Sequence, residues 1–138
     1  MAFFGIVVLC LTYCCSADFP SGTYVGQIAN PYLRVVCSFY RPPKPFVIIN
    51  VTCNRAIPYS PLTTVDIVEV PGKTPKEFSV KPDTKNIGRM KELTDRLNGM
   101  CPGRGFSAGD FVVYTEVNSG FAYDVDVKKT KMRLYLRV

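Results

Sequence analysis

The segment LRVVCSFYRPPKPFVIINVTC, residues 33–53, decides the fold. Two runs rich in apolar residues, 33–40 and 46–53, flank RPPKP, whose three prolines cannot lie inside a strand ladder. A hairpin that places Tyr40 opposite Phe46 turns alternate residues of both runs toward one apolar face. That face consists of Leu33, Val35, Cys37, Phe39, Val47, Ile49, Val51 and Cys53. The hairpin therefore predicts an antiparallel sheet with this face toward the core.

Further strand patterns lie on both sides of the hairpin. They occupy 23–28, 63–70, 77–80, 109–117, 121–127 and 128–138. The fold class that we expect is α+β, with an antiparallel β-sheet of six to seven strands. A two-sheet sandwich is the alternative arrangement of the same strands. One helix stands before a C-terminal three-strand meander.

The expected helix covers about 84–98. Asp83 or Thr84 can cap its start, and Gly99 is suited to end it. Apolar residues recur at helical spacing and predict a single buried face. That face consists of Ile87, Met90, Leu93 and Leu97.

Basic and apolar side chains alternate near the end of KKTKMRLYLRV, residues 128–138. Pairing this strand with the preceding one can place Asp126 opposite Lys131 and Asp124 opposite Arg133. Opposite charges across paired strands contribute about 0.2–1 kcal/mol each, which favours this register. The basic residues are therefore interpreted as part of an ordinary sheet strand.

The first 17 residues, MAFFGIVVLCLTYCCSA, are apolar from Phe3 to Cys15 and end in small residues. Such a run is too short to span a bilayer and is typical of a secretory signal peptide. We expect residues 1–17 to be a signal peptide and residues 18–138 to form a single secreted domain without a membrane span. A membrane anchor is the alternative.

Removal of residues 1–17 takes away three of the six cysteines and leaves Cys37, Cys53 and Cys101. In the hairpin register, Cys37 and Cys53 lie four positions apart along the ladder, roughly 13 Å. A disulfide bridges Cα atoms no more than ~7 Å apart. Cys37 lies mid-strand, where a thiol behaves as a small apolar residue. We therefore predict a disulfide between Cys53 and Cys101.

The chain contains no histidine, which excludes Ser-His-Asp and Cys-His catalysis and histidine-containing zinc sites. It has no phosphate loop, dinucleotide fingerprint or EF-hand sequence. A hydrolase with paired carboxylates is a remaining alternative, but the acidic residues mostly fit solvent-facing or cross-strand positions. We predict a protein that is not an enzyme and has no catalytic residues, metal or cofactor.

The segment FYRPPKPF, residues 39–46, is the predicted partner-binding site. Its prolines restrict the loop before binding, and aromatic and arginine side chains are frequent anchors of protein interfaces. The candidate contact residues are Tyr40, Arg41, Lys44 and Phe46. The alternative is a stiff connection between two strands with no binding role.

A glycosylation sequon, Asn50-Val51-Thr52, lies in the second strand of the hairpin. The predicted register places Asn50 on the face away from the core, where an attached glycan would reach solvent. In a secreted chain this makes Asn50 a candidate glycosylation site.

The net charge of +6 is spread along the chain instead of concentrated in one patch. We therefore predict a small secreted, non-enzymatic binding protein that acts by protein–protein interaction with a host or extracellular target. An effector-like, toxin-like or immune-modulating role follows by analogy of class. The alternative is a secreted polyanion binder for RNA or glycosaminoglycan that uses its basic surface. The densest basic groups are on the expected helix, at Lys85, Arg89, Lys91 and Arg96, and at the turn formed by Lys128 and Lys129.

Overall fold

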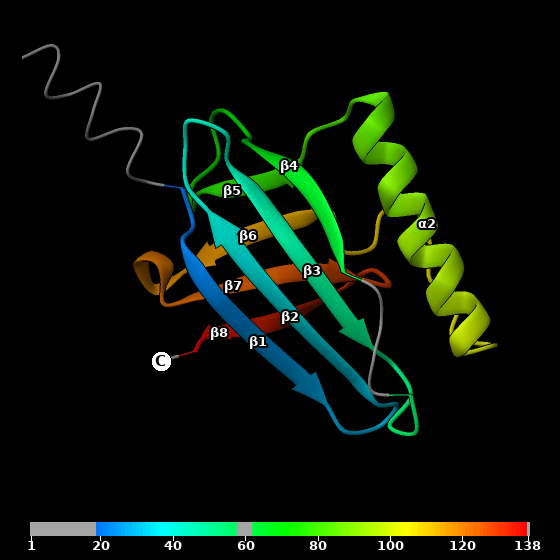
Figure 1. The fold of residues 1–138 in the computed structure, drawn as a ribbon. Coiled ribbons are helices and arrows are strands. Elements are labelled where there is room, and N and C mark those ends of the chain that lie inside the picture. The colour runs from blue at the N-terminus through cyan, green and yellow to red at the C-terminus, as the bar shows by residue number, and fades with distance from the viewer. Residues whose placement is uncertain (1–18, 58–61, 138) are drawn as a thin grey trace, which may run out of the picture.

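The computed structural model describes residues 19–57 and 62–137. Its strands are β1 (Gly22–Ile28), β2 (Leu33–Tyr40), β3 (Phe46–Thr52), β4 (Thr63–Glu69), β5 (Glu77–Val80), β6 (Val113–Val117), β7 (Ala122–Val127) and β8 (Thr130–Leu136). Helix α2 (Thr84–Met100) lies between β5 and β6, and a 3₁₀ turn at Asn118–Gly120 joins β6 to β7. Each strand pairs antiparallel with the next, and β1 also pairs with β8, so the sheet closes into an eight-stranded barrel (Figure 1).

The closed barrel corrects the predicted fold class. An open sheet of six to seven strands, or a two-sheet sandwich, is wrong, whereas the predicted helix before the C-terminal strands is present in the described part of the chain. The difference arises at one seam, where Tyr24 lies opposite Leu136 and Val25 opposite Tyr135. Hydrophobic alternation reports which face of a strand is buried and not which distant strand it joins.

Gly26 lets the first and last strands approach each other at this seam. A Cβ atom at Gly26 would lie 2.6 Å from the carbonyl oxygen of Arg133 and 2.7 Å from a methyl carbon of Leu134. Both distances are shorter than a van der Waals contact, so a side chain at residue 26 would require the β8 backbone to move. Glycine within a strand often marks this kind of close backbone approach in a barrel.

Two hairpin registers predicted from the sequence are confirmed. Tyr40 lies opposite Phe46 and Cys37 opposite Ile49 in the β2–β3 hairpin. In the β7–β8 hairpin, Asp126 lies opposite Lys131 and Asp124 opposite Arg133, and both pairs form salt bridges. The charged alternation of β8 is therefore compensated within the sheet.

Aromatic side chains fill the barrel interior. Tyr123 and Phe39 both contact Tyr24, with ring centroids 5.0 and 5.7 Å apart, and Phe39 also contacts Tyr114 at 5.3 Å. Phe78 packs against Tyr123 at 6.2 Å. All five of these side chains are buried. The interior of an eight-stranded barrel is just wide enough for side chains to fill, and here they do.

Helix α2 lies beside the barrel and packs chiefly against β4 (Figure 1). Asp83 caps its start, as expected, by accepting a hydrogen bond from the Asn86 N–H (2.8 Å). Asn86 is buried because it also pairs with β4: its Oδ1 accepts from the Asp66 N–H and its Nδ2 donates to Asp66 Oδ2, both at 3.2 Å. Hydrogen bonds from Lys85 and then Asn86 lower the pKa of the Asp66 carboxyl.

The buried face of α2 differs from the predicted one. Met90, Leu93 and Leu97 are buried as expected, but the Ile87 residue is 57% exposed. The Asn86–Asp66 pairing sets the rotation of the helix and turns Ile87 outward, since neighbouring helical residues are about 100° apart. The helix also continues through Gly99 to Met100 instead of ending at the glycine.

Candidate functional sites

The β2–β3 loop carries the predicted partner-binding residues. The rings of Tyr40 and Phe46 stack on each other, with centroids 4.6 Å apart and planes 11° from parallel. Tyr40 is 46% exposed, and Arg41 and Lys44 are exposed between the two strands. Neither Arg41 nor Lys44 forms a salt bridge within residues 19–57 and 62–137. The β2–β3 loop and its flanking strand ends therefore carry a stacked aromatic pair and two exposed cations next to each other.

The loop stands at the end of the barrel that also carries the β4–β5 loop, the β6–β7 turn and the start of β1 (Figure 1). Pro43 and Lys44 border a hollow of about 550 Å³ beside β4. On another side, Arg41 borders a hollow of about 300 Å³ that contains Tyr24 and Glu116. Burial raises the pKa of the Tyr24 hydroxyl, although the charge of Arg41 opposes this shift. The loop thus lies between two hollows.

The basic residues of α2 have partners of their own. Lys85 pairs with Asp66 (3.0 Å), Lys91 with Asp95 (2.8 Å) and Arg96 with Glu92 (3.8 Å). The Arg89 guanidinium donates a hydrogen bond to the Thr64 carbonyl oxygen at 2.9 Å. These contacts dilute the positive charge of the helix and give no specific support to the polyanion alternative.

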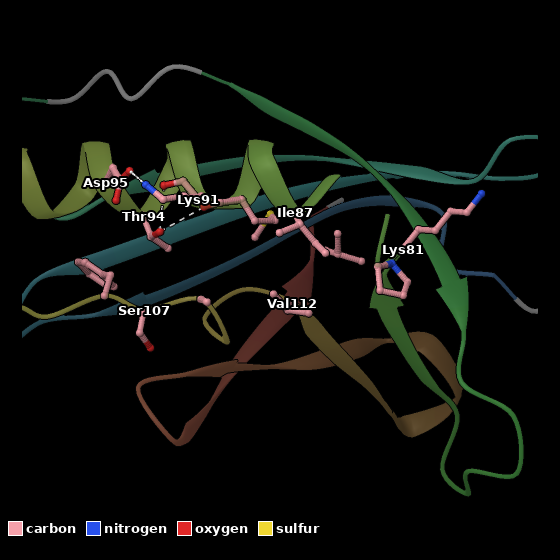
Figure 2. A pocket seen from close by; sticks show the side chains of 12 residues that line it. Lys81, Ile87, Lys91, Thr94, Asp95, Ser107 and Val112 are labelled. Atoms are coloured by element: carbon pink, nitrogen blue, oxygen red, sulfur yellow. Dashed lines mark hydrogen bonds and ion pairs between the residues drawn. The ribbon is translucent and has the colours of Figure 1, made fainter. Parts of the chain in front are cut away.

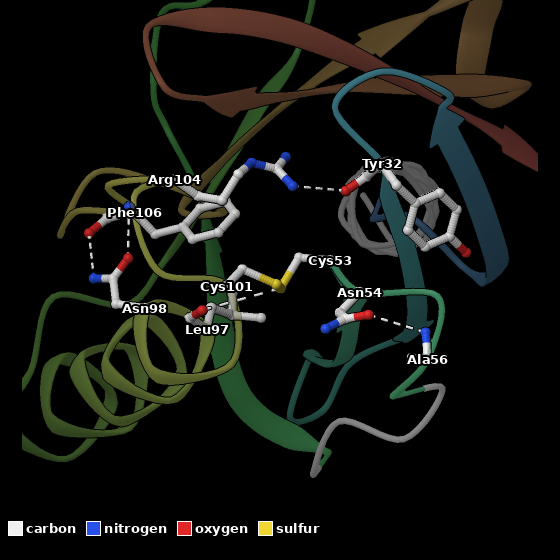
Figure 3. Close-up of a disulfide and its surroundings, with 9 residues drawn as sticks. All are labelled: Tyr32, Cys53, Asn54, Ala56, Leu97, Asn98, Cys101, Arg104 and Phe106. Atoms are coloured by element: carbon white, nitrogen blue, oxygen red, sulfur yellow. Dashed lines mark hydrogen bonds between the residues drawn. A yellow bond between two sulfur atoms is a disulfide. The ribbon is translucent and has the colours of Figure 1, made fainter.

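The disulfide predicted between Cys53 and Cys101 is present, with Cα atoms 6.3 Å apart (Figure 3). It joins the end of β3 to the residue that follows α2. Near it, the Arg104 guanidinium donates to the Tyr32 carbonyl oxygen at 2.8 Å. The disulfide and this hydrogen bond connect the end of the helix to the β1–β2 and β3 side of the barrel.

Among the cysteines that the structure describes, Cys37 has a free thiol, and it is fully buried in the barrel. Burial raises the pKa of this thiol to about 12, although a hydrogen bond to the Tyr114 hydroxyl opposes the shift. The thiol is therefore protonated at neutral pH, and because the thiolate is the reactive form, Cys37 is unsuited to nucleophilic chemistry.

Asn50 lies on the outward face of β3, opposite Val36, between the buried residues Ile49 and Val51. Its side chain is partly exposed. The register thus agrees with the expected orientation of the sequon, and attachment of a glycan stays a prediction.

Sequence reasoning missed a groove beside α2, shown in Figure 2. The α2 groove has a volume of about 560 Å³, and its apolar walls include Val80, Pro82, Ile87, Met90, Phe106 and Val112. These residues come from the end of β5, the helix and the segment that leads to β6. The apolar side chain of Ile87 was the feature of the sequence that could have indicated the groove. Its helical spacing from Met90, Leu93 and Leu97 instead predicted a buried position.

Within the part of the chain that the structure describes, no group of three or more cysteine or acidic residues is placed to hold a metal ion. None of the described helices is long and apolar enough to cross a membrane. No protein-family model, curated protein or solved structure matches the chain.

Proposed function

We propose that this chain is a small secreted binding protein that contacts an extracellular or host protein through its β2–β3 loop. The observation that carries the proposal is the stack of exposed Tyr40 on partly buried Phe46, flanked by exposed Arg41 and Lys44. Aromatic and arginine side chains dominate many protein interfaces, and a proline-rich loop loses little conformational freedom on docking. The two cations favour a partner surface with acidic groups around an apolar recess.

Secretion is part of this proposal. The Cys53–Cys101 disulfide supports it, because disulfides persist mainly in oxidising compartments. The apolar run from Phe3 to Cys15, which lies outside the described residues, supports it as a signal peptide. An effector-like or immune-modulating role is proposed only by analogy with other small secreted proteins, and no contact in the structure bears on it.

Processing gives a direct check of the secretory part. Mass spectrometry of protein released by a eukaryotic secretory host should find a chain that begins at Asp18 and carries a glycan on Asn50. Replacing Thr52 with Ala should remove the glycan, because the sequon requires a hydroxyl residue at that position. Retention of the Phe3–Cys15 run on the released chain would contradict the signal-peptide assignment.

Charge reversal in the loop tests the binding surface. The double variant Arg41→Glu, Lys44→Glu should weaken partner binding by about tenfold or more, because it places acidic groups where the partner's acids dock. Its melting temperature should stay within a few degrees, since both side chains are exposed. Binding would be measured by cross-linking and quantitative mass spectrometry of extracellular proteins captured on the immobilised variants.

The matched control is Lys128→Glu, Lys129→Glu in the β7–β8 turn, which changes the net charge equally at the other end of the barrel. A partner that the wild type and the control retain, and the loop variant loses, supports the proposal. Equal losses in both variants, with a steep fall of affinity with salt, would instead favour the polyanion alternative. Full retention by the loop variant would contradict the loop as contact site.

A further inference from the structure

The α2 groove is lined by residues other than those of the β2–β3 loop. Its volume of about 560 Å³ lies within the range of small-molecule sites, roughly 300–1,000 Å³. The rings of Tyr24, Phe39 and Tyr123 pack against one another inside the barrel, and the hollow that reaches Tyr24 and Tyr123 has a volume of about 300 Å³. The α2 groove is larger and has more apolar walls, so it is better suited to an apolar ligand.

The wall opposite α2 is held in place by buried hydrogen bonds. Asn98 of the helix accepts from the Phe106 N–H (2.8 Å) and donates to the Phe106 carbonyl oxygen (2.9 Å). Asp110 is buried and accepts from the N–H groups of Ser107 (2.9 Å) and Lys128 (2.6 Å). These contacts fix the segment against both the helix and the β7–β8 turn. The groove is thus preformed, which lowers the cost of ordering on binding.

Of the charged side chains that line the groove, Lys81 is the one without a salt bridge among the described residues. The Thr94 hydroxyl donates within the helix, to the Met90 and Lys91 carbonyl oxygens (3.2 and 3.1 Å), and offers little to a ligand. Lys91 and Asp95 neutralise each other across 2.8 Å.

Lys81 differs from these groups, because it forms no salt bridge with any residue that the structure describes. Asp66, the carboxyl whose pKa Lys81 helps to lower, is already paired with Lys85 at 3.0 Å. Figure 2 shows Lys81 at one end of the groove and the Lys91–Asp95 pair at the other. In Figure 2 the ammonium group of Lys81 points away from the groove, and a change of rotamer in this exposed side chain would bring it over the mouth.

We propose that the α2 groove binds a single-chain anionic amphiphile, such as a fatty acid. The alkyl chain lies between Ile87, Met90 and Phe106, where it covers the exposed side chain of Ile87. The carboxylate lies at the Lys81 end, where a change of rotamer brings the ammonium group of Lys81 to it. A cationic or uncharged head group would lack this partner, so the charge selects among amphiphiles of equal chain length.

Calorimetric titration with dodecanoate, below its micelle concentration, tests the proposal on the disulfide-bonded protein. One equivalent should bind, and dodecanol and dodecyltrimethylammonium should bind more weakly. Lys81→Glu should lower the affinity for dodecanoate about tenfold without lowering the affinity for dodecyltrimethylammonium. The substitution reverses the charge of the side chain that faces the ligand head group and leaves the apolar walls unchanged. Equal affinity for the three head groups, or several equivalents bound, would overturn the proposal.

Two substitutions locate the alkyl chain. Ile87→Ser should weaken dodecanoate about tenfold, because it removes apolar contact area from the wall. Ala108→Phe should block binding, because Ala108 is exposed and lines the groove. Ile28→Ser, at a residue 41% exposed at the end of β1, is the matched control and should leave the affinity unchanged.

The outcome separates this site from the protein-binding loop. Arg41→Glu should leave dodecanoate affinity within a factor of two, whatever its effect on a protein partner, because Arg41 borders a different hollow from the one that Lys44 and Lys81 line. No binding of dodecanoate, or binding that survives both Ile87→Ser and Ala108→Phe, would overturn the groove assignment. Neither result would bear on the loop.

Discussion

Replacing Cys53 and Cys101 together with Ala is expected to lower the free energy of unfolding by about 3–4 kcal/mol. The disulfide spans 48 positions in the sequence, and cross-links over longer loops remove more conformational freedom from the unfolded chain. Urea unfolding of the oxidised wild type and the double variant would measure the difference. Reduced wild-type protein should match the variant.

The effect should be largest at the end of α2. The Cys101 N–H donates to the Leu97 carbonyl oxygen at 2.8 Å, so the last helical turn leads directly into the cross-link. Amide exchange of the last turn and of residues 101–106 should quicken in the variant more than exchange in β2. A loss below 1 kcal/mol would show that packing alone holds the helix end in place.

Cys37 supplies an internal control for this experiment. Because it is fully buried, with its thiol pKa raised to about 12, it should resist alkylation at pH 8 in the folded protein and react after unfolding. Non-reducing peptide mapping should recover Cys37 as the alkylated cysteine. A Cys37–Cys53 link would contradict both the disulfide and the hairpin register.

Replacing Gly26 with Ala is expected to destabilise the protein by about 2–3 kcal/mol, at the high end for overpacking a well-fitted site. The added methyl group would approach the Arg133 carbonyl oxygen to 2.6 Å, and backbone cannot move aside as a flexible side chain can. The reduced freedom of the unfolded chain offsets less than 1 kcal/mol of this cost. The melting temperature should fall by about 10 °C.

The matched control is Gly88→Ala in α2, where an added Cβ meets nothing within 4 Å. It should stabilise the protein by about 1 kcal/mol, because alanine favours a helix over glycine. Replacing glycine with alanine should thus lower the stability at residue 26 and raise it at residue 88.

Amide exchange gives a second readout at the seam. The Arg137 N–H donates to the Thr23 carbonyl oxygen at 2.8 Å, and its protection should fall first in Gly26→Ala. Unchanged stability of Gly26→Ala would show that β8 can shift without loss and that Gly26 does not control closure.

Much of the local structure was readable from the sequence. Period-two alternation in 33–40 and 46–53 set the β2–β3 register, and the Asp126–Lys131 and Asp124–Arg133 pairs set that of β7–β8. Both depend on strands joined by short connections, so few arrangements compete. The disulfide followed because the hairpin register placed Cys37 and Cys53 too far apart to bond with each other.

The two candidate sites differ in how far the sequence predicts them. The loop residues Tyr40, Arg41, Lys44 and Phe46 were identified because they are contiguous in sequence. The α2 groove was not, because it joins the end of β5, the helix and the segment before β6. That segment was predicted to belong to a strand over 109–117, but Phe111 has a positive φ of 64° and β6 begins at Val113.

The sequence by itself determined the strand faces, two hairpin registers, the helix and the choice of disulfide, because each depends on periodicity or on charge and distance within neighbouring strands. Only the tertiary structure decided that β1 meets β8 and that Ile87 lies in an open groove. Barrel closure depends on the summed twist and coil of eight strands, together with the absence of a Cβ atom at Gly26. The exposure of Ile87 depends on the rotation of α2, which is set by the pairing of Asn86 with Asp66 on another element.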